Sequence, residues 1–169
     1  MAIRILVFDD DELIRITLTN FLKQEGYEVA SFNQPDHCPL YYSEACTCQE
    51  ENGCADIIIT DLNMPGTSGV NFIEKQLRQG CKVKRIAVMS GDWGDSGLVR
   101  ARELGCMVFK KPFSILDMKK WLEGIRKDFQ DEPVVMPLNF CKLNKDIKNR
   151  TFESKTNASG IPLQKPIKS

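Results

Sequence analysis

The sequence lacks any apolar run long enough to cross a bilayer, and no signal-peptide pattern precedes its first apolar segment. We therefore expect a cytoplasmic protein with no membrane partner. Histidine is almost absent, so His37 is the only imidazole that a metal site could use. A net charge is also lacking, because 23 basic side chains balance 23 acidic ones.

The balance of charge hides two parts of opposite sign. From residue 141 onward, seven Lys or Arg and two acidic residues give a net charge of +5, which leaves −5 on residues 1–140. Four prolines follow residue 129, and the apolar residues there are too few for a core. We therefore predict one domain over residues 1–129 and a basic, largely disordered tail over residues 130–169. The tail has no room for a nucleic-acid-binding domain, so we expect no specific nucleic-acid partner.

Apolar runs alternate with segments of helical period through the predicted domain. The runs are rich in β-branched residues, which is typical of strands that are buried on both faces. Such alternation predicts a parallel sheet with helices on both sides, an α/β fold. The expected strands are 3–8, 27–32, 56–60, 85–90 and 107–110, and the expected helices are one that ends at Gly26 and those at 70–78, 96–104 and 114–129.

One helix is missing from this alternation. Where it is due, between the second and third strands, residues 33–55 are rich in Cys, Pro and Gly. The cysteines of this insert are Cys38, Cys46, Cys48 and Cys54. Four neighbouring thiolates favour a tetrahedral zinc site, with His37 as a substitute ligand, although their spacing lacks the paired C-x2-C of common zinc folds. An iron–sulfur cluster, a disulfide and unligated thiols are the alternatives.

Acidic residues follow two of the expected strands. Asp9 and Asp10 come directly after the first strand, and Asp61 comes directly after the third. The carboxyl ends of neighbouring parallel strands meet at the edge where α/β folds bind their ligands. Carboxylates so close together repel one another and favour a cation between them. The sequence therefore predicts a divalent-metal site at this edge, with Asp11 and Glu12 at the start of the next helix.

Two further polar residues fall at the same edge. Ser90 ends the fourth strand, and Lys111 follows the fifth. With these residues in this order, the chain closely resembles the receiver domain of bacterial two-component response regulators, of the stand-alone CheY-like type. The likeness covers about residues 2–127, and the matching stretches are ILVFDDDELIR, IIITDLNMPGTSG, AVMSG and FKKPF.

The resemblance implies a flavodoxin-like (βα)5 fold of three layers with the sheet order 2-1-3-4-5. It also implies that Asp61 accepts a phosphoryl group from a phosphohistidine on a sensor histidine kinase or a phosphotransfer protein. Mg²⁺ would be held by Asp10, Asp61 and the backbone carbonyl of Asn63, with Asp9 acting through water.

The resemblance further implies how such a switch would signal. Lys111, aimed by a cis peptide bond to Pro112, would contact the acceptor carboxylate and then the phosphoryl group. Ser90 would move its hydroxyl onto the phosphoryl group and draw residues 91–97 with it. The chain would then be a switch and not an enzyme, and it would act on a downstream protein. Where the family often has an aromatic residue three positions before the lysine, this chain has Val108.

Two other functions would use similar parts. A haloacid-dehalogenase-type phosphatase has an aspartyl nucleophile in a D-x-D pattern after its first strand, and Asp9 and Asp11 have that spacing. The sequence lacks the later acidic pair and the cap domain of such enzymes, and it would leave Asp61 without a role. A pseudo-receiver or metal-sensing adaptor would use the cysteine insert as its input and leave phosphorylation idle. The presence of both Asp61 and Lys111 favours the phosphoacceptor switch.

Overall fold

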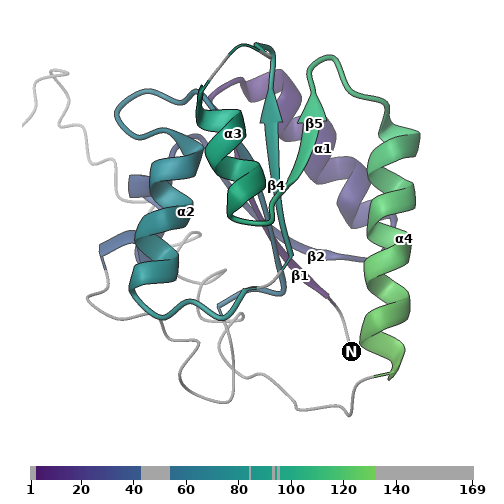
Figure 1. Cartoon of the computed structure of the whole chain (residues 1–169). Coiled ribbons are helices and arrows are strands. Elements are labelled where there is room, and N and C mark those ends of the chain that lie inside the picture. The colour runs from purple at the N-terminus through teal and green to yellow at the C-terminus, as the bar shows by residue number, and fades with distance from the viewer. Residues whose placement is uncertain (1–2, 43–53, 84, 93, 95, 132–169) are drawn as a thin grey trace, which may run out of the picture.

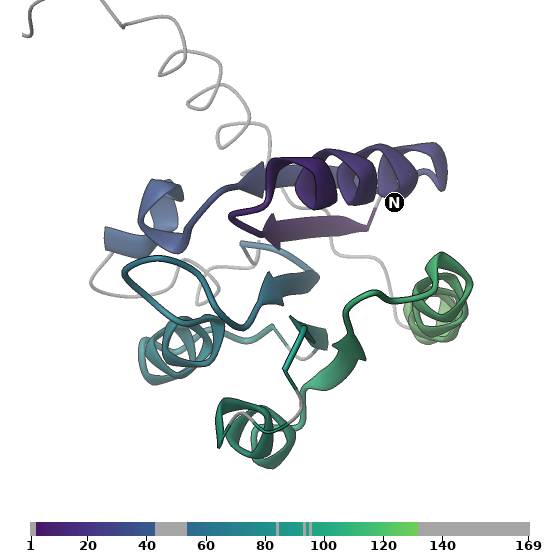
Figure 2. The ribbon, with the colours of Figure 1, turned by 90° about the horizontal axis from the view of Figure 1, so that it is seen from above.

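The computed structural model describes residues 3–42, 54–83, 85–92, 94 and 96–131. Within them, five parallel strands form a single sheet in the order β2-β1-β3-β4-β5. Helices cover both faces of this sheet (Figures 1 and 2), which confirms the predicted flavodoxin-like order and its three layers. The strands are β1 (Arg4–Phe8), β2 (Glu28–Phe32), β3 (Ile57–Asp61), β4 (Arg85–Ser90) and β5 (Met107–Lys110), and the helices are α1 (Glu12–Gln24), α2 (Gly69–Arg78), α3 (Ser96–Glu103) and α4 (Ile115–Asp131).

The central strands are mostly apolar because both of their faces are covered. Every residue of β1 and of β3 is buried. Successive side chains of a strand point to opposite faces, so Leu6 and Phe8 pack in one core cluster while Ile5 and Val7 pack in another. The first cluster includes side chains of α2 and α3, and the second includes side chains of α1 and α4. The two cores therefore lie on opposite sides of the sheet.

A buried ion pair aligns two neighbouring strands at the amino end of the sheet. The Arg4 guanidinium lies 2.8 Å from Asp56 Oδ1, and the Arg4 backbone N–H donates to Asp56 Oδ2 at 2.8 Å. Both side chains are largely shielded from solvent. The pair supports the register in which Ile5 lies opposite Ile57, and this register places the carboxyl ends of β1 and β3 side by side.

Two 3-10 turns, η1 (Pro35–His37) and η2 (Pro39–Tyr42), follow β2 where a helix would otherwise come. The Tyr41 ring stacks on Phe72 of α2, with the ring centroids 6.3 Å apart. Lys75, one turn further along α2, places its ammonium 3.5 Å from the centre of the Tyr41 ring. Within residues 33–42 and 54–56 no α-helix occurs, and these turns cover part of α2. Residues 43–53 and 132–169 lie outside the described part, and with them about half of the cysteine insert, including Cys46 and Cys48, and nearly all of the predicted tail.

Local signals determine where the helices begin. Asp11 is the N-cap of α1, and its carboxylate accepts hydrogen bonds from the backbone N–H groups of Leu13 and Ile14. This confirms the expectation that Asp11 serves the helix start. Ser114 acts similarly before α4, because its Oγ accepts from the Leu116 N–H. Among the described residues, no helix is both long enough and apolar enough to span a membrane.

Candidate functional site

Three of the predicted site residues meet at the carboxyl edge of the sheet. The Lys111 ammonium lies 2.6 Å from Asp61 Oδ1 and 2.8 Å from Asp9 Oδ2. Asp61 is the last residue of β3, one residue later than the predicted strand end, because its backbone still pairs with Met89 of β4. Asp9 directly follows β1 and is completely buried, and Asp61 is 5% exposed. Two shielded carboxylates therefore share one ammonium group.

Backbone groups hold the other oxygen of each carboxylate. Asp9 Oδ1 accepts a hydrogen bond from the Asp11 N–H at 3.0 Å, and Asp61 Oδ2 accepts one from the Asn63 N–H at 2.9 Å. Each carboxylate is thus fixed by a lysine contact on one oxygen and a peptide N–H on the other. This arrangement orients both acids before any ligand is present.

Burial and neighbouring charges shift the pKa values of Asp9 and Lys111. Burial raises the pKa of Asp9, and the negative charge of Asp61 adds to this, while Lys111 and the Asp11 N–H oppose it only in part. For Lys111, burial alone would lower the pKa, but hydrogen bonds and attraction from Asp61 and Asp9 outweigh it and raise the pKa. Lys111 is therefore firmly protonated, and this one ammonium faces two carboxyl groups.

The donor set at this edge fits a magnesium ion. Mg²⁺ favours oxygen ligands, keeps several waters and needs only one or two carboxylates from a protein. Asp9 and Asp61 provide two neighbouring carboxylates, while the Asp10 side chain is exposed. Within the described ranges, no three His, Cys, Asp or Glu side chains converge into a fuller metal site. The chemistry thus suits a partly hydrated ion and does not suit a site made only of protein ligands.

A glycine makes room for the turn after β3. An added Cβ on Gly69 would lie 2.1 Å from the backbone oxygen of Asp61 and 2.9 Å from the Thr60 hydroxyl. The Gly69 N–H also donates to the Leu62 carbonyl at 2.8 Å. The first residue of α2 therefore packs directly against the peptide of Asp61, so the position of this acid depends on Gly69 having no side chain.

Ser90 reaches the site through its backbone and not through its hydroxyl. Its carbonyl accepts a hydrogen bond from the Lys111 N–H at 2.8 Å. Its Oγ donates to the Asp92 carbonyl at 2.8 Å and accepts from the Asp92 N–H at 3.2 Å. The hydroxyl is buried and engaged with the loop after β4, so it would have to rotate to contact a group on Asp61.

Sequence reasoning missed the role of Arg15. Its guanidinium donates to the backbone carbonyl of Asp9 at 2.9 Å and to that of Asp10 at 3.5 Å. Arg15 lies one helical turn after the N-cap Asp11, so α1 carries its side chain back toward the acidic loop. That spacing is the signal in the sequence that could have indicated this contact.

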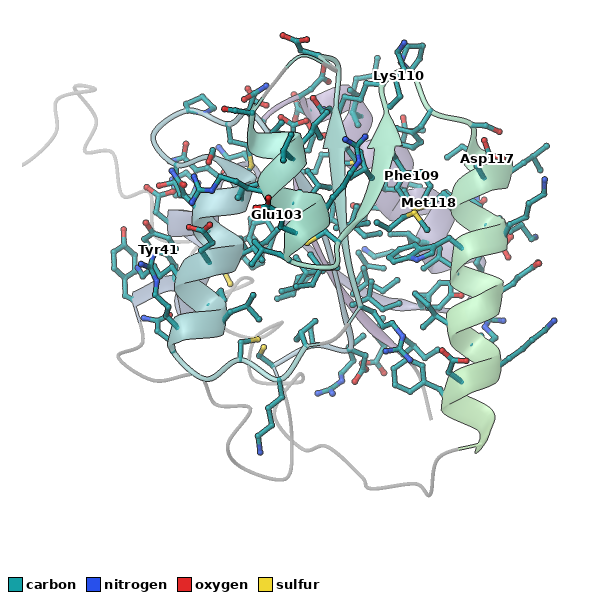
Figure 3. The ribbon with its side chains drawn as sticks, viewed as in Figure 1. Tyr41, Glu103, Phe109, Lys110, Asp117 and Met118 are labelled. Atoms are coloured by element: carbon teal, nitrogen blue, oxygen red, sulfur yellow. The ribbon has the colours of Figure 1, made fainter. Side chains whose placement is uncertain are left out.

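Val108 and Phe109, which precede Lys110 and Lys111, face opposite sides of the sheet. Phe109 belongs to the core on the α1 and α4 side, next to Met118 of α4 (Figure 3), and its ring packs against Trp121. Val108 packs against the core on the other side. The aromatic ring of Phe109 therefore lies on the opposite side of the sheet from Val108.

The predicted zinc site has no support in the described part of the chain. Cys54 contacts Cys81, with the two sulfur atoms 4.0 Å apart, and Cys38 is buried in the apolar core. His37 is exposed and hydrogen-bonds to the Asn33 and Gln34 side chains. The other two predicted ligands, Cys46 and Cys48, lie outside the described residues. Cys81, which contacts Cys54, is not among the predicted ligands and belongs to the same buried core as Cys38.

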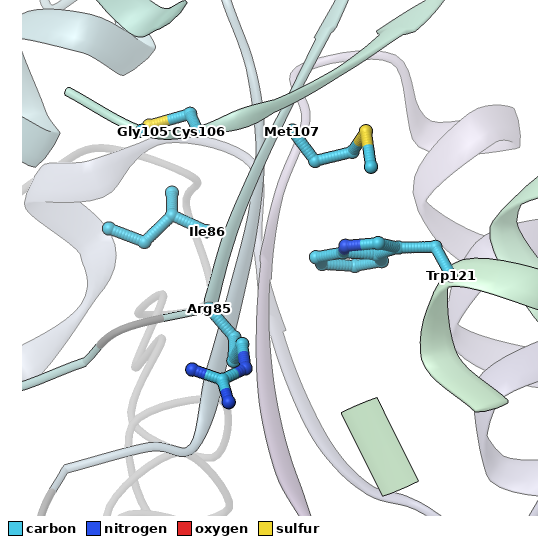
Figure 4. Close-up of a pocket in the computed structure, with 6 residues that line it drawn as sticks. All are labelled: Arg85, Ile86, Gly105, Cys106, Met107 and Trp121. Atoms are coloured by element: carbon cyan, nitrogen blue, oxygen red, sulfur yellow. The ribbon is translucent and has the colours of Figure 1, made fainter. Parts of the chain in front are cut away.

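A hollow on the sheet lies apart from the acidic residues. It is formed where β4 and β5 begin, whereas Asp61 and Lys111 lie at the strand ends. Among the residues that line it, Arg85 is the one charged side chain, and Trp121 of α4 forms part of its wall (Figure 4). Its residues are Arg85, Ile86, Gly105, Cys106, Met107 and Trp121. The hollow offers no carboxylate and does not belong to the site at Asp61.

Solved structures share this fold. The crystal structure of a response regulator receiver protein from Pseudomonas putida matches with a TM-score of 0.61 and 24% sequence identity, over 73% of this chain and 98% of that one. A receiver domain protein (CheY-like) from Methanospirillum hungatei matches with a TM-score of 0.57 and 23% identity, over 88% of this chain and 99% of that one. At these identities the matches establish the fold alone.

Sequence relatives extend the likeness. The transcriptional regulatory protein PdtaR of Mycobacterium tuberculosis is 30% identical over 121 residues, which are 68% of this chain and 52% of PdtaR. A probable chemotaxis protein CheY of Rhizobium etli is 30% identical over 127 residues, which are 73% of this chain and 92% of that protein. The chain spans about half the length of PdtaR. The family model of the response regulator receiver domain matches residues 5–123. The chain therefore belongs to the response regulator receiver domain family.

Proposed function

We propose that this receiver domain is a phosphoacceptor switch in which Asp61 takes a phosphoryl group from a phosphohistidine. The observation that carries the proposal is the position of the Lys111 ammonium, 2.6 Å from Asp61 and 2.8 Å from Asp9. Phosphorylation and magnesium binding are typical of the family to which the chain belongs. The geometry supports Asp61 as the acceptor because this carboxylate ends a strand at the ligand-binding edge of the sheet.

In the proposed reaction, a carboxylate oxygen of Asp61 attacks the phosphorus atom. The new O–P bond forms while the N–P bond to the donor imidazole breaks, and the electron pair of that bond returns to the ring nitrogen. Catalysis of this kind depends on alignment and charge neutralisation more than on covalent activation. The N–H of Asn63 and the ammonium of Lys111 hold the Asp61 carboxylate in one orientation and limit its motion before the attack.

Asp9, Asp10, Asp61 and the Asn63 carbonyl would hold Mg²⁺, which would neutralise charge on the phosphoryl oxygens. The residues of the chain supply the rest. Lys111, which already touches the acceptor carboxylate, would pair with a phosphoryl oxygen after transfer. Arg15 would keep the acidic loop in place through its bond to the Asp9 carbonyl.

Ser90 would convert this local charge into a change of shape. Its hydroxyl now bonds to the Asp92 backbone. Rotation toward a phosphoryl group on Asp61 would break these bonds and release the loop after β4, which leads into α3. The proposed output is therefore a changed surface around α3, recognised by a downstream protein. The proposed donor is a sensor histidine kinase or a phosphotransfer protein.

Acetyl phosphate with Mg²⁺ tests the acceptor without a kinase. Intact mass spectrometry should show a gain of about 80 Da, the mass of one phosphoryl group. Asp61→Asn should abolish the gain, and Asp9→Asn should reduce it. Asp117→Asn is the matched control, because this aspartate is exposed on α4, and it should leave the gain unchanged.

Two results would contradict the proposal. A gain that persists in Asp61→Asn and disappears in Asp9→Asn would place the nucleophile at Asp9, as in the haloacid-dehalogenase-type phosphatases. The absence of any gain in the wild type with several small phosphodonors would favour a pseudo-receiver. In either case, circular dichroism of each variant would show whether the fold is intact.

A further inference from the structure

Two cysteines from separate loops lie in contact at the amino end of the sheet. Cys54 Sγ and Cys81 Sγ are 4.0 Å apart. Cys54 lies three residues before β3, and Cys81 lies four residues before β4. Since Asp61 ends β3, the sulfur pair is at the edge of the sheet opposite to the acidic site. The contact therefore has no part in the function proposed for that site.

The surroundings of the pair would allow the sulfur atoms to approach further. A disulfide needs an S–S distance of about 2.05 Å, so each sulfur atom would move by roughly 1 Å. Neither cysteine lies inside a strand or a helix. The Cys81 N–H is bonded to the Gln76 carbonyl just after α2, and Gly80 before it has a φ of +82°. Rotation about the side-chain torsions, with small adjustments in these loops, would suffice.

The exposure of the two sulfur-bearing residues limits which oxidant can reach them. Cys54 and Cys81 are each 8% exposed, whereas Cys38 in the same core is 1% exposed. A small oxidant can reach such residues, but a bulky one such as a glutathione disulfide is hindered. The two cysteines therefore lie at the margin of the core, where a peroxide can reach their thiols.

We propose that Cys54 and Cys81 form a redox modification site, at which a peroxide converts two neighbouring thiols into an intramolecular disulfide. One thiolate attacks a peroxide oxygen, breaks the O–O bond and becomes a sulfenic acid, and one water is released after protonation. The second thiolate then attacks the sulfenic sulfur, so that the S–S bond forms and a second water leaves. The two thiols lose two electrons and two protons in total, and a dithiol reductant reverses the change.

The disulfide would enclose a functionally important segment. The chain between Cys54 and Cys81 contains β3 with Asp61 at its end, the turn with Gly69, and α2. A disulfide between the cysteines would link the residues just before β3 to those just after α2. The oxidised protein should therefore unfold at a higher temperature, by on the order of 10 °C, because a closed loop lowers the entropy of the unfolded chain.

Peptide mapping of the full-length wild-type protein tests the site directly. Hydrogen peroxide should remove about 2 Da per bond formed, that is, two hydrogen atoms. After the remaining thiols are alkylated, cleavage after glutamate separates the cysteines, since residues 52–74 contain only Cys54 and residues 75–103 contain only Cys81. The expected product is a cross-link between these two peptides that disappears on reduction with dithiothreitol.

Serine variants provide the controls. Cys54→Ser and Cys81→Ser should each abolish the cross-link and the thermal shift. Cys106→Ser should keep both, because Cys106 is equally buried in the same core and burial raises the pKa of its thiol to about 11. Oxidation of the wild type without the 52–74 to 75–103 cross-link would overturn the proposal, as would a cross-link to another cysteine peptide. This result does not depend on whether Asp61 accepts a phosphoryl group.

Discussion

At the scale of single residues, the acidic site places two carboxyl groups against one ammonium group. Lys111 neutralises part of the charge that Asp9 and Asp61 place in a shielded space, and both carboxylates compete for it. The ionised form of a buried acid loses its hydration, and one shared ammonium does not restore all of that loss. An added cation at this site would therefore stabilise the folded protein.

The raised pKa of Asp9 gives a prediction for the pH dependence of stability. Folded Asp9 keeps its proton to a higher pH than the unfolded chain does, so ionisation of Asp9 costs stability as the pH rises through the folded pKa. Asp9→Asn should therefore be more stable than the wild type near neutral pH. This advantage should shrink as the pH falls, and it should vanish well below the unfolded pKa of about 4, where the carboxyl is protonated in both states. Urea unfolding in metal-free buffer at a series of pH values measures it.

The exposed Asp117→Asn variant is the control for this experiment. Asp117 lies in the first turn of α4, where a negative charge is mildly favourable. Its replacement should slightly lower the free energy of unfolding near neutral pH, which is opposite in sign to the change expected for Asp9→Asn. A wild type that stays more stable than Asp9→Asn at every pH would show that the hydrogen bonds of Asp9 outweigh the cost of burying its charge.

The sequence predicted which residues gather at this edge of the sheet better than it predicted their detailed contacts. Asp9, Asp61 and Lys111 meet as expected because the carboxyl ends of parallel strands share one edge. The direction of the Ser90 hydroxyl could not be predicted, since it depends on a bond to the Asp92 backbone two residues later. The contact of Arg15 with the acidic loop was missed, although the position of Arg15 one helical turn after the N-cap Asp11 is a local signal for it.

At the scale of secondary-structure elements, the junction of β3 and α2 is the tightest contact of the site. The missing Cβ of Gly69 leaves space for the Asp61 carbonyl, so Gly69→Ala must push α2 away from β3. We expect a loss of about 1 to 3 kcal/mol in the free energy of unfolding, in the range of an overpacked site. The displaced Asp61 should also take up phosphoryl groups more slowly from acetyl phosphate.

Gly124→Ala in α4 is the matched control for this change. An added Cβ there has no atom within 4 Å, and alanine favours a helix by up to about 1 kcal/mol. Denaturant unfolding should therefore show opposite signs for the two substitutions. Equal stabilities of Gly69→Ala and the wild type would mean that the junction yields easily and does not fix Asp61.

The elements themselves were largely predictable. Buried strands of β-branched residues and helices bounded by caps and glycines give strong local signals, and the bounds of β4 and β5 agree with the prediction. The composition after β2 predicted a missing helix, and the described residues 33–42 and 54–56 contain none. The stacking of Tyr41 on Phe72 and the contact of Cys54 with Cys81 were not predictable, because each joins loops or helices far apart in the sequence. Such pairings arise only when the sheet order brings those segments together.

At the scale of the whole molecule, the described members of both core clusters and the acidic site lie within residues 3–131. We therefore expect a fragment of residues 1–131 to fold and to gain a phosphoryl group as the full chain does. Thermal unfolding and intact mass with acetyl phosphate compare the two. This experiment also tests the predicted domain boundary near residue 129, since a fragment that fails to fold would show that later residues complete the domain.

A shorter fragment provides the contrast. Residues 1–113 keep Lys111 and Asp61 but lose α4, which contributes Met118, Leu122 and Ile125 to one core. Removing three buried apolar side chains and exposing their partners costs several kcal/mol, a large share of the stability of a domain of this size. This fragment should be unfolded by circular dichroism and should gain no mass.

The hydrogen bond from Lys111 to Asp9 also determines when the site can form during synthesis of the chain. It joins residues 102 positions apart, and the strand that precedes Asp9 lies between β2 and β3 in the sheet. A ribosome delivers the acids early and the lysine much later. The growing chain therefore carries its acidic loop without a counter-charge until β5 has emerged, so the ability to receive a signal would arise only when synthesis of this domain is nearly finished.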